Sequence, residues 1–121
     1  MKFMTIVKHR ENQGAPPASL IQAIGQLGVD AGQKGVFVEM GGLMPSAAGA
    51  EVALKGGKIT VTDGPFTEAR EVFGGWAVYN VPSKQEAIDW AKRFLDLHTE
   101  HWPGFEATVE VRQVMEMPPQ S

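Results

Sequence analysis

The sequence contains no cysteine among its 121 residues. The chain therefore has no disulfide, no thiolate nucleophile and no thiolate ligand for a metal ion. It also has no apolar run long enough to cross a bilayer and no three-part signal peptide at its N-terminus, so we expect a cytoplasmic protein that does not enter the membrane. A glycine-rich phosphate loop of known spacing and a Ser-His-Asp pattern are both missing, which argues against nucleotide binding and serine hydrolysis.

The sequence also lacks a large excess of either positive or negative charge. Lys and Arg number 11 against 14 Asp and Glu, and the net charge of -3 provides no field that would attract nucleic acid. With 43% hydrophobic and 21% charged residues, the chain has the composition of an ordinary globular protein. We expect one domain over residues 1–116, a loose tail over residues 117–121, and no cofactor.

Hydrophobic periodicity predicts six strands and two helices. The strands are expected at residues 3–7, 36–40, 51–55, 58–62, 73–81 and 107–112. The helices are expected to follow Ser19 and Ser83, which form capping boxes with Gln22 and Glu86. The order β-α-β, hairpin, β-α-β predicts an α+β fold, the ferredoxin-like split βαβ arrangement with an inserted β-hairpin.

Two local details extend this prediction. The first helix contains Gly25, Gly28 and Gly32, each costing about 1 kcal/mol relative to alanine, and close approach to the sheet would explain them. Gly56-Gly57 favours a tight hairpin turn that pairs Leu54 with Ile59 and Val52 with Val61. Those four side chains share one side of the hairpin, which we expect to be buried.

The predicted sheet has more apolar surface than two helices can cover. Residues 3–7 and 76–81 carry apolar side chains that point to both faces, whereas two helices cover only one face. A second copy of the chain is the simplest cover for the other face. The sequence therefore predicts a homodimer with its sheets face to face and a cavity for a small-molecule ligand between them.

Residues 61–71, with the sequence VTDGPFTEARE, resemble the signature of the DGPF subgroup of YCII-related proteins. The similarity continues through residues 74–76, 83–90, 97–104 and 111–114. The resemblance implies a dimeric α/β-barrel related in fold to muconolactone isomerase, with no general activity established and with relatives discussed alongside extracytoplasmic-function sigma factors. The wider family has a proposed His-Asp pair in its cavity.

Asp63 is the only acid of the Asp63-Gly64-Pro65-Phe66 turn, referred to below as the DGPF turn. Its carboxylate either accepts backbone N–H bonds in an Asx turn or acts as a general base that removes a proton next to a carbonyl. His9, just after the first strand, is the candidate acid–base partner. The leading hypothesis is an isomerase or lyase acting on a small organic acid or lactone. The alternative is a non-catalytic dimer that binds a small molecule or has a regulatory role, and the resemblance implies a link to extracytoplasmic-function sigma factors.

Further candidates concern substrate binding. Arg70 is suited to a substrate carboxylate, although a solvated loop is the simpler interpretation of its charged surroundings. Glu39 either faces solvent or supplies a second carboxylate to the cavity, and Phe66 is expected to fill the core or the subunit seam beside it. His98 and His101 have the spacing of metal ligands, but no third ligand accompanies them, so no metal site is predicted.

Overall fold

The structure is a computed structural model that describes residues 1–66 and 69–117. Thr67 and Glu68 of the signature segment lie outside the described residues, and so do residues 118–121 of the predicted tail. No helix in the described part of the chain has the length and apolar character needed to span a membrane.

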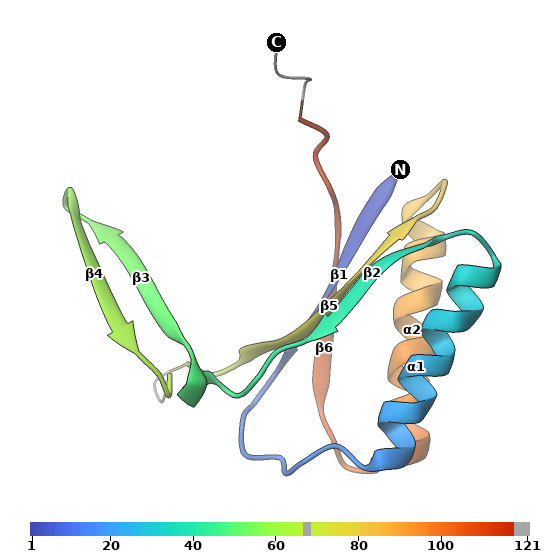
Figure 1. The fold of residues 1–121 in the computed structure, drawn as a ribbon, viewed down its shortest axis with the longest axis horizontal. Helices are drawn as coiled ribbons and strands as arrows, with labels where there is room; N and C mark the ends of the chain where they lie inside the picture. Colours follow the sequence, from blue (N-terminus) through green and yellow to red (C-terminus); the bar gives the residue numbers. More distant parts are fainter. Residues whose placement is uncertain (67–68, 118–121) are drawn as a thin grey trace.

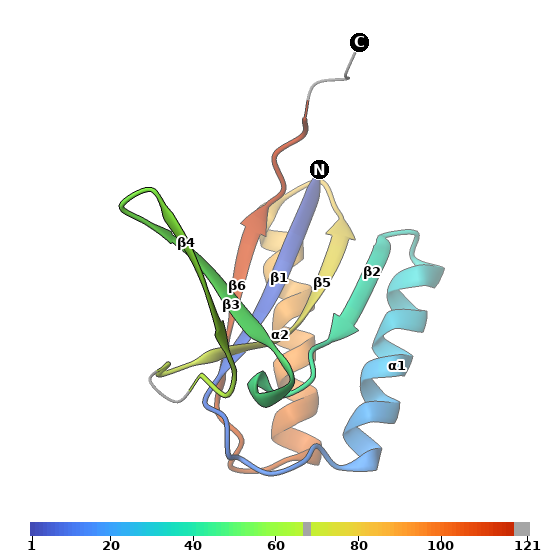
Figure 2. The same cartoon turned by 60° about the vertical axis from the view of Figure 1, so that its left-hand side comes forward.

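The chain folds into a four-stranded antiparallel sheet, two helices and a separate hairpin. The elements are β1 (Lys2–His9), α1 (Ala18–Gln33), β2 (Phe37–Gly42), the short 3-10 helix η1 (Ser46–Ala48), β3 (Ala50–Lys55), β4 (Lys58–Asp63), β5 (Val72–Asn80), α2 (Lys84–His101) and β6 (Ala107–Gln113). The main sheet has the order β2-β5-β1-β6 (Figure 2), and both helices lie on one of its faces (Figure 1). The predicted α+β, ferredoxin-like fold with an inserted β-hairpin is confirmed.

The core lies between the sheet and the two helices. Phe3 and Tyr79 face each other across β1 and β5, and both are almost completely buried. The Tyr79 ring stacks on Trp90 of α2 with centroids 5.4 Å apart, and Leu27 of α1 closes the same cluster. Because side chains alternate along a strand, Met4 and Ile6 of β1 point to the opposite face, where no helix lies. We call this uncovered surface the open face of the sheet.

The N-termini of the two helices are capped in different ways. The Ser83 hydroxyl accepts a hydrogen bond from the Glu86 N–H, as predicted for α2. The capping box predicted for α1 is wrong: its N-cap is Pro17, without a side-chain cap, and Ser19 is already inside the helix. Pro17 has the extended backbone of a cap, and its carbonyl accepts from the N–H groups of the first turn, so the helix begins before the serine.

The three glycines of α1 have different surroundings, so one explanation does not account for all of them. A Cβ at Gly28 would lie 3.5 Å from the Met40 side chain, so this glycine does face the sheet. A Cβ at Gly25 or Gly32 would meet nothing within 4 Å. Close approach to the sheet, the predicted explanation, is therefore wrong for these two positions.

The hairpin β3–β4 has the predicted register, with Leu54 opposite Ile59 and Val52 opposite Val61. Gly56 and Gly57 have φ angles of 55° and 77°, the left-handed conformation that the two-residue turn requires. The predicted burial of its apolar side is wrong for the chain by itself. These four side chains are 67% to 71% exposed, because the hairpin stands away from the sheet (Figure 1).

Candidate functional site

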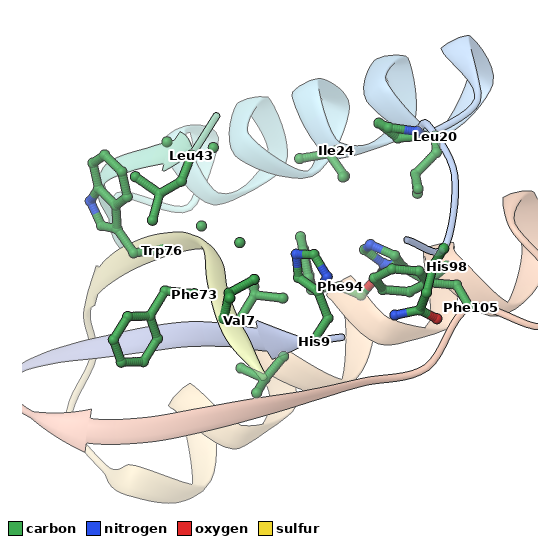
Figure 3. Close-up of a pocket in the computed structure, with 18 of the residues that line it drawn as sticks. Val7, His9, Leu20, Ile24, Leu43, Phe73, Trp76, Phe94, His98 and Phe105 are labelled. Atoms are coloured by element: carbon green, nitrogen blue, oxygen red, sulfur yellow. The ribbon is translucent and has the colours of Figure 1, made fainter. Parts of the chain in front are cut away.

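A pocket of about 820 Å³ opens between the main sheet and the helices, at the end where β1 stops and α1 starts. Leu20 and Ile24 point into it from α1, opposite the imidazole of His9 (Figure 3). Residues before and after the hairpin, including Pro45 and Pro65, complete its wall. This pocket is formed within one chain on the helix side of the sheet, whereas the sequence predicted a cavity between two sheets.

His9, the last residue of β1, lines this pocket. Its Nδ1 lies 2.8 Å from the Arg10 carbonyl oxygen. A carbonyl only accepts hydrogen bonds, so Nδ1 carries the proton and Nε2 presents a lone pair. The ring also packs against Phe105, with centroids 5.6 Å apart. His9 therefore has the tautomer and the fixed orientation of a general base.

His98, on the last turns of α2, is a second imidazole on the same pocket. Its Nδ1 lies 2.9 Å from the Phe94 carbonyl oxygen, so here too Nδ1 donates and Nε2 is left as an acceptor. The side chain is 8% exposed. Burial lowers the pKa of His98, and the nearby His9 lowers it further, while the bond to Phe94 acts in the opposite direction. Burial therefore favours the neutral form of the His98 imidazole.

Aromatic rings form the floor of the pocket around the two histidines. Phe105 stacks on Trp102 at 4.2 Å and on His98 at 5.2 Å, and His98 in turn contacts Phe94 at 4.5 Å between ring centroids. Rings joined in this way are rigid and present flat apolar faces. The floor suits a flat molecule with little charge.

Glu11 is the carboxylate of the pocket. Its oxygens accept hydrogen bonds from the backbone N–H of Ser46, at 2.8 Å, and from the Ser46 hydroxyl. The Ser46 hydroxyl in turn accepts from the backbone N–H of Phe66, at 3.1 Å. The bonds from the Ser46 side chain and backbone, helped by His9, lower the pKa of Glu11. Glu11 thus stays ionised and ties the DGPF turn to the loop after β1.

Gly64 of the DGPF turn is required for a steric reason. A Cβ at this position would overlap the Ser46 carbonyl oxygen and lie 2.6 Å from its carbonyl carbon. Gly64 is not among the glycines with positive φ, so the requirement for glycine here comes from the close contact and not from its backbone conformation. The Gly64–Pro65 peptide is cis, and the Gly64 N–H donates to the Gly49 carbonyl.

The other candidate residues lie away from the pocket. Asp63 is exposed at the end of β4, and no hydrogen bond joins its carboxylate to another described residue. Arg70 is exposed, and Glu39 is exposed on the open face of the sheet. Phe66 is half-buried and lies near Gly49, so it packs under the 3-10 helix. The pocket thus brings together His9 and the DGPF turn through Glu11, but not the other predicted residues.

The charges that line the pocket restrict its ligand. Its ionisable side chains are His9, Glu11, Tyr79 and His98, and no Lys or Arg lines it among the described residues. In the same described part of the chain, no three His, Asp or Glu side chains gather as metal ligands. Since Glu11 is an anion, the pocket repels a free carboxylate and favours a neutral molecule.

Sequence reasoning overlooked Glu11 and Ser46 and considered His98 only as a metal ligand. Glu11 and Ser46 are 35 positions apart, and no local spacing connects them. His98 follows Phe94 by one helical turn on the apolar stripe of α2, which was a signal of burial.

A family model for the YCII-related domain matches residues 1–118, nearly the whole length of the chain. No curated protein matches the chain. The chain belongs to the YCII-related domain family.

Proposed function

We propose that this YCII-related protein is a small-molecule enzyme of the isomerase or lyase type, with His9 as its acid–base residue and the pocket between sheet and helices as its active site. The observation that carries the proposal is the geometry of His9. Its Nδ1–H is bound to the Arg10 carbonyl, which leaves the Nε2 lone pair free on an apolar pocket wall. A positioned imidazole is the commonest general base in enzymes.

The reaction follows from this geometry. Nε2 of His9 takes a proton from the carbon next to a substrate carbonyl, and the electron pair of the broken C–H bond moves onto the carbonyl oxygen. Return of the proton to a different carbon completes an isomerisation. In a lyase, the same electron pair expels a leaving group from the neighbouring carbon.

The charges of the pocket narrow the substrate class. The sequence allowed either a small organic acid or a lactone. Glu11 is ionised and the described lining has no Lys or Arg, so a neutral lactone or related carbonyl compound is favoured over a free acid. Substrate binding by Arg70, Glu39 or Phe66 and catalysis by Asp63 stay predictions from the sequence.

A second candidate function is binding without chemistry, in a regulatory dimer. The stacked rings of Phe94, His98, Phe105 and Trp102 favour it, because they form a binding surface for a flat molecule whether or not a reaction follows. A link to extracytoplasmic-function sigma factors, and a cytoplasmic location, rest on the sequence alone.

For the assembly, we propose a homodimer that buries the open face of the sheet. Met4, Ile6 and Trp76 remain only partly buried there in a single chain. Such a contiguous apolar surface is typical of an interface.

A ligand panel separates the two functions. Small lactones and their ring-opened acids are titrated against the native protein while tryptophan fluorescence is recorded, since Trp102 belongs to the aromatic floor of the pocket. We expect lactones to bind better than the acids. Turnover should be lost in His9→Gln and kept in His101→Gln, a control whose side chain is outside the pocket lining. Asp63→Asn separates this proposal from the sequence prediction: the variant keeps turnover if His9 is the base and loses it if Asp63 is.

The outcomes are distinct. Lactone binding without turnover by the native protein would refute the enzyme and leave the binding function. If neither lactones nor acids bind, the pocket is not the functional site and both candidates fail.

A further inference from the structure

Within the described residues, the hairpin β3–β4 stands apart from the main sheet. It forms a two-stranded sheet of its own, hydrogen-bonded to no strand of the main sheet. Figure 1 shows it projecting from the side of the sheet opposite the helices. A two-stranded hairpin by itself is only marginally stable in water. Something outside the chain should therefore hold it.

One side of the hairpin is apolar. Val52, Leu54, Ile59 and Val61 share this side, and each is at least 67% exposed. The register also places Asp63, opposite Ala50, on the same side at the base of the hairpin. The other side carries Glu51, Ala53, Lys55, Lys58, Thr60 and Thr62. The hairpin thus presents an apolar stripe that ends in a negative charge.

The open face of the sheet complements this stripe. Met4, Ile6 and Trp76 form its apolar centre. Beside them Glu110 is shared by two cations, at 3.2 Å from Lys8 and 2.9 Å from Arg112, so one carboxylate faces two positive charges. The two cations leave a local surplus of positive charge around Glu110, which suits the Asp63 carboxylate, while Glu39 lies on the same face at the opposite edge of the sheet.

We propose that the hairpin is an arm that packs its apolar stripe on the open face of a second copy of this chain, with Asp63 near the partner's surplus cation. The inference rests on the proposed homodimer and adds its mode of contact. A two-fold axis covers both arms and both open faces at once, because each chain carries one of each.

The two arms account for part of the area that a dimer needs. Four aliphatic side chains about two-thirds exposed give on the order of 250 Å² per arm. Two arms then supply on the order of 500 Å² of the roughly 1,600 Å² that a stable interface buries, so the proposed contact also requires the surface that the arms cover on the two sheets.

Matched substitutions test the arm. Val61→Asp puts a charge on the apolar side, whereas Thr60→Asp puts the same charge on the other side of the same strand. We expect Val61→Asp to raise the dimer dissociation constant about 100-fold, from about 10-fold at each of two equal contacts, and Thr60→Asp to change it less than 3-fold. Asp63→Lys should also weaken the dimer, whereas Glu51→Lys should not. The measurement is sedimentation equilibrium at several concentrations.

A second measurement does not depend on whether these variants fold. Since the chain has no cysteine, Ile59→Cys and Thr60→Cys each introduce a single thiol. Maleimide should label the thiol at position 59 at least 10-fold more slowly than that at position 60, and dilution below the dissociation constant should remove the difference.

The outcomes separate the two proposals. A monomeric native protein overturns both the homodimer and the arm. A dimer that responds equally to Val61→Asp and Thr60→Asp, with equal labelling at both positions, overturns the arm alone. Ligand binding in the pocket, measured with the same variants, is independent of either result because one chain forms the pocket.

Discussion

Replacing Gly74 with alanine should displace the proposed general base while leaving the fold intact. Gly74 is the extra residue of the β5 bulge, since β1 pairs Val7 with Gly75 and then Lys8 with Phe73. The His9 imidazole lies directly over it. An added Cβ would lie 2.5 Å from Cδ2 of His9 and closer still to Nε2.

The size of the effect follows from these distances. The imidazole has to retreat by about 0.9 Å before its Cδ2 reaches the 3.4 Å of ordinary contact. Such a shift breaks the 2.8 Å bond from His9 Nδ1 to the Arg10 carbonyl, which costs about 1 kcal/mol of folding free energy. Misplacing a catalytic group by about 1 Å costs roughly 100-fold in rate. Activity should therefore fall far more than stability.

The assay pairs Gly74→Ala with Gly42→Ala. Gly42 also lines the pocket, but a Cβ there meets nothing within 4 Å. Nitrogen NMR of the imidazoles should show the Nδ1–H tautomer of His9 in the native protein and in Gly42→Ala, and its loss in Gly74→Ala. Unfolding in urea and turnover of any lactone that binds are measured alongside. If both variants keep the native tautomer and the native rate, the assigned position of His9 is wrong.

Three further predictions concern stability. Gly25→Ala and Gly32→Ala should each raise the free energy of unfolding by about 1 kcal/mol, since an added Cβ meets nothing; a loss in denaturant titration would contradict this. Burial lowers the pKa of His98, so the folded state binds fewer protons than the unfolded one below about pH 6.5. Stability should therefore be complete above that pH and decline as the pH falls towards the lowered pKa, and calorimetry of His98→Phe should show a weaker decline. Ser46→Ala should lower the free energy of unfolding and raise the pKa of Glu11, measurable by carboxylate NMR; an unchanged pKa would refute that contact.

The fold was predictable because its signals are local. The Gly56-Gly57 turn determines which hairpin residues pair, and the order of strands and helices restricts the sheet to few topologies. Burial of the hairpin was not predictable in the same way. A two-sided pattern along β3 and β4 shows that one side avoids water, but not whether the cover belongs to the same chain.

The sequence pointed to one pocket residue, His9, but not to Glu11 and Ser46. His9 was chosen as a candidate because it lies where the predicted first strand ends, and the structure places it at the end of β1, on the pocket. Glu11 was missed because its partner Ser46 comes from a 3-10 helix after β2, and the contact depends on how the chain returns from the sheet. Asp63 drew attention as the acid of a recognisable motif, yet its neighbours Gly64 and Phe66 are the residues that meet Ser46.

The strand order has a consequence for biosynthesis. β1 is the first strand to leave the ribosome, but it lies between β5 and β6, the last two strands to be made. During synthesis β1 therefore has no partner strand, and its apolar side chains stay uncovered by one until almost the whole domain has emerged. A nascent chain in that condition is exposed to aggregation, and its folding is slow because the pairings join distant segments. We therefore expect this topology to be most vulnerable to aggregation during translation, before β5 and β6 have been made.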